Sequence, residues 1–228
     1  MKILVSDYDR TFDLDENMIK KNIESIKEFQ NKGNIFVFAT GRSYYDFLKK
    51  KDKYNLIYDY VLLNHGATIL DNEDNVLDNY PINENYLEIK KYLKLEKSIM
   101  SFCCSKLDSR VDFNHSNLTK IAVRYLPFVN IKKIKEELDN NFSSINSYMV
   151  STNMLEIVSK DISKDKAIEL LIKKLKIKKK DVYTIGDSYT DYLMIKKFNG
   201  YCVPNANIEI KEIAKEVLSI RELINEII

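Results

Sequence analysis

Apolar residues along the chain follow two different periods, one typical of buried strands and one typical of amphipathic helices. Short and nearly continuous apolar runs predict strands that are buried on both faces, as in a parallel sheet. These runs lie at residues 2–9, 35–40, 60–64, 181–187 and 200–203. Between residues 15 and 32, apolar residues instead recur every three or four positions, and Gly33 follows as a stop signal. The alternation of the two patterns predicts a doubly wound, Rossmann-like α/β core.

The same helical spacing predicts further helices, and two short apolar segments predict a hairpin. The helices are expected over residues 44–51, 164–175, 189–197 and 208–215, and the hairpin strands over 67–70 and 75–78.

The α/β pattern is interrupted near Pro81. Six elements are expected after it, in the order helix, strand, strand, helix, strand, strand, over 84–95, 98–105, 119–126, 131–140, 144–150 and 153–158. This order is typical of an α+β unit (αββαββ) rather than of a parallel sheet. We therefore expect a core domain formed by residues 1–80 and 159–228, with an inserted domain over 81–158.

Composition and charge exclude several classes of protein. Of the 228 residues, 45% are hydrophobic and 31% are charged, which predicts a packed core with a charged surface. The net charge of +2 gives no reason to expect nucleic-acid binding. No apolar run approaches the roughly 20 residues of a membrane span, and no leader precedes the first strand, so we expect a cytoplasmic protein. The three cysteines form no CxxC pair and predict neither a disulfide scaffold nor a zinc site.

Polar residues follow four of the predicted strands, at the edge where an open parallel sheet binds its ligands. They are Asp7, Asp9 and Thr11; Thr40, Gly41 and Arg42; Asn64, His65 and Gly66; and Gly186, Asp187, Ser188 and Asp191. Carboxylates that converge in this way repel one another. A hard divalent cation such as Mg²⁺ relieves the repulsion and still leaves room for water and a phosphate oxygen.

Several of these segments resemble the motifs of the haloacid dehalogenase superfamily of phosphohydrolases. DYDRT (7–11) resembles the DxDxT motif, FATGR (38–42) the second motif, ISKDKAI (162–168) the lysine-bearing third and GDSYTDYLM (186–194) the fourth. VLLNHGATI (61–69) and PNAN (204–207) resemble two further segments of the Cof-like subgroup. The matches stand in family order and cover nearly the whole chain. The position of the insert resembles that of a short C2-type cap, which would open and close on joints near Pro81 and Ser159.

The resemblance implies a Mg²⁺-dependent phosphomonoesterase that acts on a small phosphorylated metabolite, such as a sugar phosphate or phosphoglycolate. It implies that Asp7 is the nucleophile and forms an aspartyl phosphate. It implies that Asp9 protonates the leaving oxygen and later activates water. Thr40 and Lys164 would hold the phosphoryl oxygens.

The resemblance also implies a metal site and a set of substrate contacts. Asp7, Asp187 and the backbone carbonyl of Asp9 would bind Mg²⁺, while Asp191 would orient Lys164 or a metal-bound water. The further substrate contacts expected from the motifs are Thr11, Gly41, Arg42, Asn64 and Asn205. On the inserted domain, four cationic residues are candidates to meet an anionic substrate, although each could equally be a solvated surface residue: Arg110, His115, Lys120 and Arg124.

Two residues depart from the family pattern. Arg10 stands where DxDxT often has Gly, and because positive φ is costly for arginine we expect ordinary backbone angles there. Its side chain is expected to point toward a substrate phosphate or an acidic neighbour. Thr190 replaces the usual Asn before Asp191, and a small effect is expected since Thr still forms hydrogen bonds.

Other interpretations remain open from the residues alone. Asp7 and Asp9 could be a helix cap and a solvent-facing turn residue, and Lys160 or Lys166 could be the inward lysine in place of Lys164. His65 is expected to have a structural or a surface role. A phosphomutase or a catalytically silent protein that binds a phosphorylated ligand are the alternative functions, and the chain could be a monomer or a homodimer.

Overall fold

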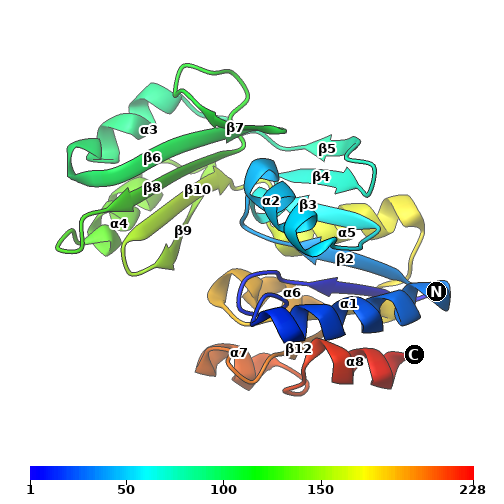
Figure 1. Cartoon of the computed structure of the whole chain (residues 1–228). Coiled ribbons are helices and arrows are strands. Elements are labelled where there is room, and N and C mark those ends of the chain that lie inside the picture. The colour runs from blue at the N-terminus through cyan, green and yellow to red at the C-terminus, as the bar shows by residue number, and fades with distance from the viewer.

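Two β-sheets, each with its own cluster of buried apolar residues, make up the molecule (Figure 1). The computed structural model describes residues 1–228, with every side chain except that of Ser109. We call the larger sheet the core sheet and the smaller one the cap sheet. In Figure 1 the cap sheet lies at the upper left, beside one end of the core sheet.

The core sheet is parallel in its centre, as the continuous apolar runs predict. Its strand order is β12 (Asn199–Cys202), β11 (Val182–Gly186), β1 (Ile3–Ser6), β2 (Ile35–Ala39), β3 (Tyr60–Leu63), β4 (Thr68–Asp71) and β5 (Val76–Asn79). The first five strands in this order are mutually parallel, and β4 and β5 add an antiparallel hairpin at one edge. Strand β1 is central and fully buried. The carboxyl ends of β1, β2, β3 and β11 therefore share one edge.

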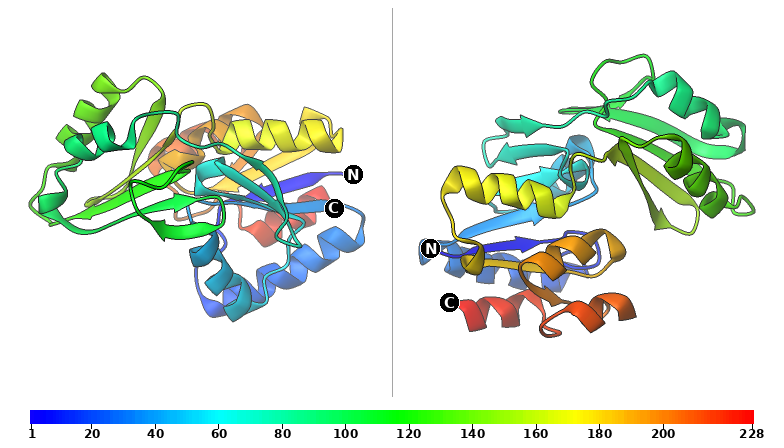
Figure 2. Two further views of the ribbon diagram at one scale, coloured as in Figure 1. Left: turned by 90° about the horizontal axis from the view of Figure 1, so that it is seen from above. Right: turned by 180° about the vertical axis from the view of Figure 1, so that it is seen from behind.

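Helices cover both faces of the core sheet (Figure 2). They are α1 (Glu16–Asn31), α2 (Tyr44–Tyr54) and α8 (Ile220–Ile227) on one face, and α5 (Lys164–Leu175) and α6 (Tyr192–Lys197) on the other, with α7 (Ile208–Ile213) next to α6. The start and end of α1 agree with the sequence signals, because the Asp15 side chain caps the N–H of Met18 and Gly33 has a φ of 76°. No helix among the described residues is long and apolar enough to cross a membrane.

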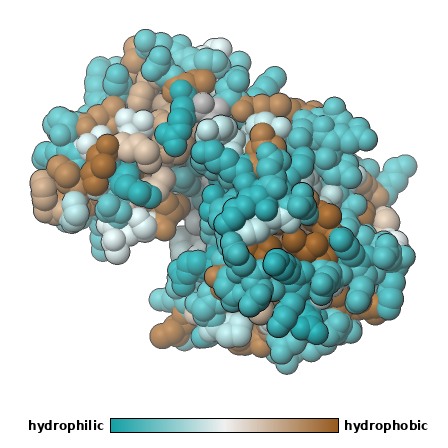
Figure 3. Space-filling model, in the orientation of Figure 1, coloured by the Kyte–Doolittle hydropathy of each residue, from teal (hydrophilic) through white to brown (hydrophobic). Residues whose placement is uncertain are grey.

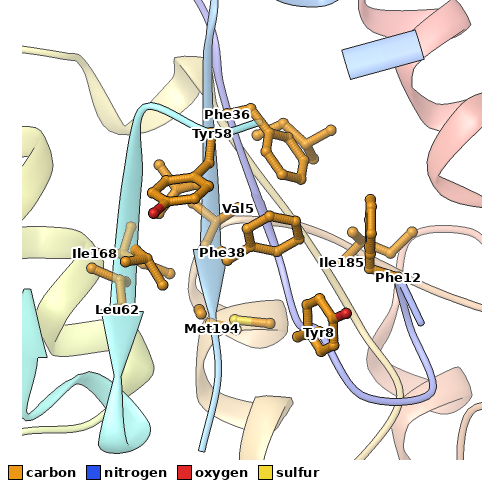
Figure 4. Packing of buried hydrophobic residues seen from close by; sticks show 14 of the residues in the cluster. Val5, Tyr8, Phe12, Phe36, Phe38, Tyr58, Leu62, Ile168, Ile185 and Met194 are labelled. Atoms are coloured by element: carbon orange, nitrogen blue, oxygen red, sulfur yellow. The ribbon is translucent and has the colours of Figure 1, made fainter. Parts of the chain in front are cut away.

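Aromatic side chains anchor the loop that follows β1 (Figure 4). Tyr8 and Phe12 are fully buried, and their rings lie 5.5 Å and 4.9 Å from the ring of Phe38 on β2. Since neighbouring side chains of extended backbone point to opposite sides, burial of Tyr8 turns Asp7 and Asp9 away from this aromatic cluster. Core packing therefore sets the direction of the two carboxylates.

The cap sheet is antiparallel, and two helices cover one of its faces. Its elements in chain order are α3 (Tyr86–Tyr92), β6 (Ser98–Ser105), β7 (Asp108–Val111), β8 (Lys120–Tyr125), α4 (Ile131–Asn141), β9 (Ile145–Ser151) and β10 (Met154–Ser159). Buried Ile89, Ile134 and Leu138 attach the helices to the sheet. The opposite face of the sheet is turned toward the core.

The observed elements differ from the expected ones in a few places. Strand β7 adds one strand to the expected αββαββ order; its sequence DSRV is short and polar and gives no strand signal. Helix α8 was not predicted. The expected helix over 189–197 is split into a short 3₁₀ turn, η4 (Tyr189–Asp191), and α6. Three other 3₁₀ turns are η1 (Asn64–Gly66), η2 (Leu95–Lys97) and η3 (Lys179–Asp181). The domain boundaries at 80/81 and 158/159 stay a prediction, and β10 runs one residue past the second.

Candidate active site

A pocket of about 570 Å³ lies between the cap sheet and the carboxyl edge of the core sheet. A hollow between the two parts is visible in the space-filling view, where most of the surrounding surface is hydrophilic (Figure 3). Charged residues from both parts line the pocket. The core contributes Asp7, Asp9, Arg10, Arg42, Asp46, Lys164 and Asp187, and the cap sheet contributes Arg110, Lys120, Arg124 and Glu156.

Lys164 connects two buried carboxylates at the floor of this pocket. Its Nζ donates to Oδ1 of Asp7 at 2.6 Å and to Oδ1 of Asp191 at 2.7 Å. Ser163 occupies the N-cap position of α5, so Lys164 is the first helical residue, as its sequence position predicts. Lys166 instead bonds the carbonyl of Lys160 at the exposed surface. Burial opposes the ammonium form, but Asp191 and Asp7 more than offset it and raise the pKa of Lys164 above its usual value.

Asp191 is fixed by hydrogen bonds to both of its carboxylate oxygens. Oδ1 accepts from Lys164, while Oδ2 accepts from the backbone N–H groups of Asp187 and Ser188, each at 3.1 Å. A Cβ on Gly186 would lie only 2.6 Å from Cγ of Asp191, so this close approach requires glycine. These bonds fix the Asp191 carboxylate in contact with Lys164. The hydroxyl of the neighbouring Thr190 hydrogen-bonds that of Ser188 at 3.0 Å.

Three carboxylates form a buried acidic cluster around this lysine. Oxygens of Asp7, Asp187 and Asp191 lie within 4.8 Å of one another. Oδ2 of Asp187 is buried and, among the described residues, accepts no hydrogen bond; the Arg10 Nε lies 3.4 Å from it. Burial, with Asp191 adding to it, raises the pKa of Asp187 to about 6. Burial also raises the pKa of Asp7 well above its usual value, although Lys164 opposes this. An oxygen-only donor set with an unused buried oxygen fits a hard divalent cation.

Asp9 is held at the rim of the pocket by Arg42. The guanidinium donates from Nε to Oδ2 of Asp9 at 2.9 Å and from Nη2 to Oδ1 at 2.5 Å. The backbone N–H of Arg42 donates to Oγ1 of the buried Thr40 at 3.1 Å, which fixes the turn after β2. Arg42 was expected to contact substrate. It lines the pocket, but its Nε and Nη2 donate to the carboxylate of Asp9.

Arg10 contradicts the expectation of ordinary backbone angles, since its φ is 61°. The reason is the turn that buries both Tyr8 and Phe12: the N–H groups of Phe12 and Asp13 both donate to the carbonyl of Tyr8, at 3.0 and 2.9 Å. Asn205 stabilises the turn from outside, because its Nδ2 donates to the carbonyl of Arg10 at 2.8 Å. The Arg10 side chain does point to an acidic neighbour, Asp187.

Only some of the remaining predicted contacts line the pocket. Gly41 lines the pocket, but Thr11, Thr40, Asn64 and Asn205 are not among the described residues that do. Thr11 is buried. Asn64 donates from Nδ2 to Oγ1 of Thr119, the residue before β8, at 3.3 Å. On the cap, His115 is exposed and outside the pocket lining, whereas Arg110, Lys120 and Arg124 line it.

A buried group of charges that sequence reasoning missed joins the two parts of the molecule. Glu156 of β10 accepts from Lys120 Nζ at 3.0 Å and bonds His65 Nε2 at 2.6 Å, and Lys120 also donates to the carbonyl of Gly41 at 2.6 Å. We call Glu156, Lys120 and His65 the Glu156 cluster. Burial raises the pKa of Glu156, but Lys120 and His65 more than offset this and lower it to about 2. The signal in the sequence is a carboxylate inside the apolar run MLEIVS, where a charge needs a partner.

Comparison with known proteins places these features in a family. The model of the haloacid dehalogenase-like hydrolases matches residues 4–129 and 104–222. A protein of Buchnera aphidicola subsp. Schizaphis graminum, named as a candidate phosphatase, is 28% identical and covers 92% of this chain and 87% of its own. A HAD/COF-like hydrolase structure from Plasmodium vivax has a TM-score of 0.84 at 21% identity, covering 100% and 95% of the two chains.

A sugar phosphatase of HAD subclass IIB has the same fold, with a TM-score of 0.78 at 17% identity and coverage of 98% and 95%. Similarity at this level concerns the fold. The family match spans nearly the whole chain and includes Asp7, Lys164 and Asp187. The chain therefore belongs to the haloacid dehalogenase-like hydrolase family, as its motifs indicated.

Proposed function

We propose that this protein is a Mg²⁺-dependent phosphomonoesterase that hydrolyses a small phosphorylated metabolite through an aspartyl phosphate on Asp7. The observation that carries the proposal is the buried Asp7 carboxylate, which Lys164 contacts at 2.6 Å and which lies beside an unused oxygen of Asp187. The Buchnera relative, which is named as a candidate phosphatase, and the sugar phosphatase of the same fold support the same class of reaction.

The metal would be held by Asp7, Asp187 and the backbone carbonyl of Asp9. When bound, it would offset the charge of the carboxylates and of the phosphoryl group. Because burial raises the pKa of Asp7, a further positive charge at this site favours the ionised form that a nucleophile needs.

The chain's own residues would carry two displacement steps. In the first, an oxygen of Asp7 attacks phosphorus, the bond from phosphorus to the leaving oxygen breaks, and Asp9 gives that oxygen a proton. In the second, Asp9 takes a proton from water, the water oxygen attacks phosphorus, and Asp7 leaves as a carboxylate. Lys164 stays charged throughout and faces the oxygens where charge builds up.

Arg42 adds a requirement to this scheme. Its bidentate contact holds the Asp9 carboxylate at the rim of the pocket. Asp9 must therefore break this contact before it can give a proton to the leaving oxygen. We propose that substrate entry displaces this contact.

Phosphate release from a panel of phosphorylated metabolites, with Mg²⁺ or with EDTA, tests the function in the wild type and in Asp7→Asn. We expect release that requires Mg²⁺ and that Asp7→Asn abolishes, with the variant's thermal unfolding checked to show that it folds. Release that persists in Asp7→Asn would rule out the aspartyl phosphate. Absence of release from every compound, including an aryl phosphate, would rule out the phosphatase.

A further inference from the structure

The cations that line the pocket fall into two groups. Four of the six have a carboxylate partner: Arg10 pairs with Asp187, Arg42 with Asp9, Lys120 with Glu156, and Lys164 with Asp7 and Asp191. Arg110 and Arg124 line the same pocket, but neither forms an ion pair with any residue that the structure describes. The surplus positive charge of the pocket therefore lies on the cap sheet.

Both arginines contact uncharged side chains, namely methionine sulfurs and an aromatic ring. Nη1 of Arg110 lies 3.9 Å from the sulfur of Met100, and its guanidinium carbon lies 4.8 Å from the ring centre of Phe102. Nη2 of Arg124 lies 3.8 Å from the sulfur of Met154. Thioethers and aromatic rings accept hydrogen bonds only weakly, while each guanidinium carries five N–H donors. Most of these donors remain available to a ligand.

The register of the cap sheet shows that Arg124 faces the core. Lys120 and Arg124 are four positions apart on β8 and therefore share a face. Lys120 reaches the carbonyl of Gly41 in the core, so this is the face that looks into the pocket. Met100 is the cross-strand partner of Arg124 and also contacts Arg110. The two arginines thus lie on β7 and β8, the two strands that flank Met100 on β6.

We infer that the leaving group of the substrate carries its own negative charge, a carboxylate or a second phosphate, which binds to Arg110 and Arg124. This inference rests on the proposed phosphatase function. The phosphoryl group that is transferred would lie at the opposite wall, against Lys164 and the acidic cluster. The pocket of about 570 Å³ is within the range of small-molecule sites, so it has room for a leaving group between the two walls.

The apolar lining adds a second feature of the substrate. Met100, Phe102 and Met154 lie next to the guanidinium groups and offer contact to a short carbon skeleton. Guanidinium groups bind carboxylate and phosphate in a planar, bidentate manner, and this binding is strong where water is partly excluded. A substrate with a neutral leaving group would leave both cations without a partner.

Two matched pairs of substrates test the inference on the full chain with Mg²⁺. 3-Phosphoglycerate and glycerol 3-phosphate differ by a carboxylate in a three-carbon skeleton, and fructose 1,6-bisphosphate and fructose 6-phosphate differ by a second phosphate. We expect the wild type to prefer the more anionic member of at least one pair in kcat/KM, and the pair that responds identifies the anion.

The variants Arg110→Gln and Arg124→Gln are compared with Arg221→Gln, which removes an exposed arginine of α8. For the preferred anionic substrate, each pocket variant is expected to lower kcat/KM by about tenfold to one-hundredfold, mainly through KM. For the matched substrate with the neutral leaving group, kcat/KM should change by less than about threefold, and Arg221→Gln should leave kcat/KM for both substrates unchanged. Thermal unfolding shows whether each variant is folded.

Three results would overturn the inference while leaving the phosphatase intact: a wild type that prefers, in both pairs, the member with the neutral leaving group; pocket variants that lose equal activity on both members; or no effect of either variant. Equal losses would show that the arginines bind the transferred phosphoryl group rather than the leaving group. Failure of the proposed function is distinct, since it would appear as release that is absent from every compound or that survives in Asp7→Asn.

Discussion

Lys164 and Lys166 are two positions apart in α5, yet they occupy opposite environments. Lys164 is buried between Asp7 and Asp191, and Lys166 lies on the exposed surface. We expect Lys164→Ala to lower kcat by at least about one-hundredfold, the loss typical of removing a charge that faces the transferred group. Lys166→Ala should retain nearly full activity. Steady-state kinetics of both variants checks this, and equal losses would contradict the assignment of Lys164.

Arg10 offers a test of backbone strain in the loop that carries Asp7 and Asp9. Arg10→Gly and Arg10→Ala both remove the guanidinium, but only glycine takes a φ of 61° without strain. The strain costs an L-residue about 1–2 kcal/mol, while glycine adds about 0.5–1 kcal/mol of chain entropy. We therefore expect the glycine variant to be more stable than the alanine variant by about 0.5–1 kcal/mol in urea denaturation. A more stable alanine variant would contradict the turn described for Tyr8–Asp13.

Strands β8 and β10 of the cap sheet each place one charged residue of the Glu156 cluster against the core. Replacing Glu156 by Gln leaves Lys120 buried without a counter-charge, and we expect this to destabilise the protein by about 3–5 kcal/mol at neutral pH. Glu88→Gln serves as a control, because Glu88 pairs with Lys91 on the exposed surface of α3. The control should change stability by no more than about 1 kcal/mol.

The effect of Glu156→Gln is also expected to depend on pH. The pKa of Glu156 is lowered from 4.5 to about 2 in the folded protein. Its contribution to stability is therefore fully present above pH 4.5 and is lost as the pH falls toward about 2. The difference in unfolding free energy between wild type and variant should shrink over that range. A difference that is constant from pH 7 to pH 3 would show that the pKa of Glu156 is the same in the folded and the unfolded protein.

The elements with strong periodicity were predictable, and those whose contacts are non-local were not. Helix α5 agrees with its expected bounds because apolar residues recur on one face and Ser163 precedes it. Strand β7 is stabilised by its pairing with β6 rather than by its own residues. Helix α8 did carry a signal, since Ser219 and Glu222 form a capping box ahead of apolar residues.

The candidate site was predictable in part from the topology. Asp7 and Asp187 follow the ends of two neighbouring parallel strands, β1 and β11, and such positions come together at one edge of the sheet. Lys164 follows no strand of that sheet; it was predicted from the resemblance of its segment to the third motif and from Ser163 before it. The partners of Arg42 and Glu156 were not, because each contact joins segments that only the tertiary fold places side by side. The angles of Arg10 were mispredicted because the burial of Tyr8 and Phe12 outweighs the residue's own preference.

Binding of a divalent cation to the acidic cluster should stabilise the whole folded protein. A ligand that binds only the folded state raises its stability by about 2.7 kcal/mol at one hundred times its Kd. We expect the Tm to rise with Mg²⁺ and to fall back on addition of EDTA, and we expect Asp187→Asn to abolish the rise. Asp181→Asn, in η3 away from the pocket lining, should preserve it. A Tm insensitive to Mg²⁺ at millimolar concentration would argue against the proposed metal site.

The Glu156 cluster also restricts how the parts of this enzyme can be recombined. Lys120 and Glu156 come from the inserted segment, whereas His65 and the carbonyl of Gly41 come from the core. An insert taken from a relative with apolar residues at the two strand positions would leave the buried His65 without its carboxylate partner and the carbonyl of Gly41 without its donor. Substrate specificity in this lineage should therefore change by substitution within the existing insert. An artificial chimera should fold only when Glu156, Lys120 and His65 are transferred together with Gly41.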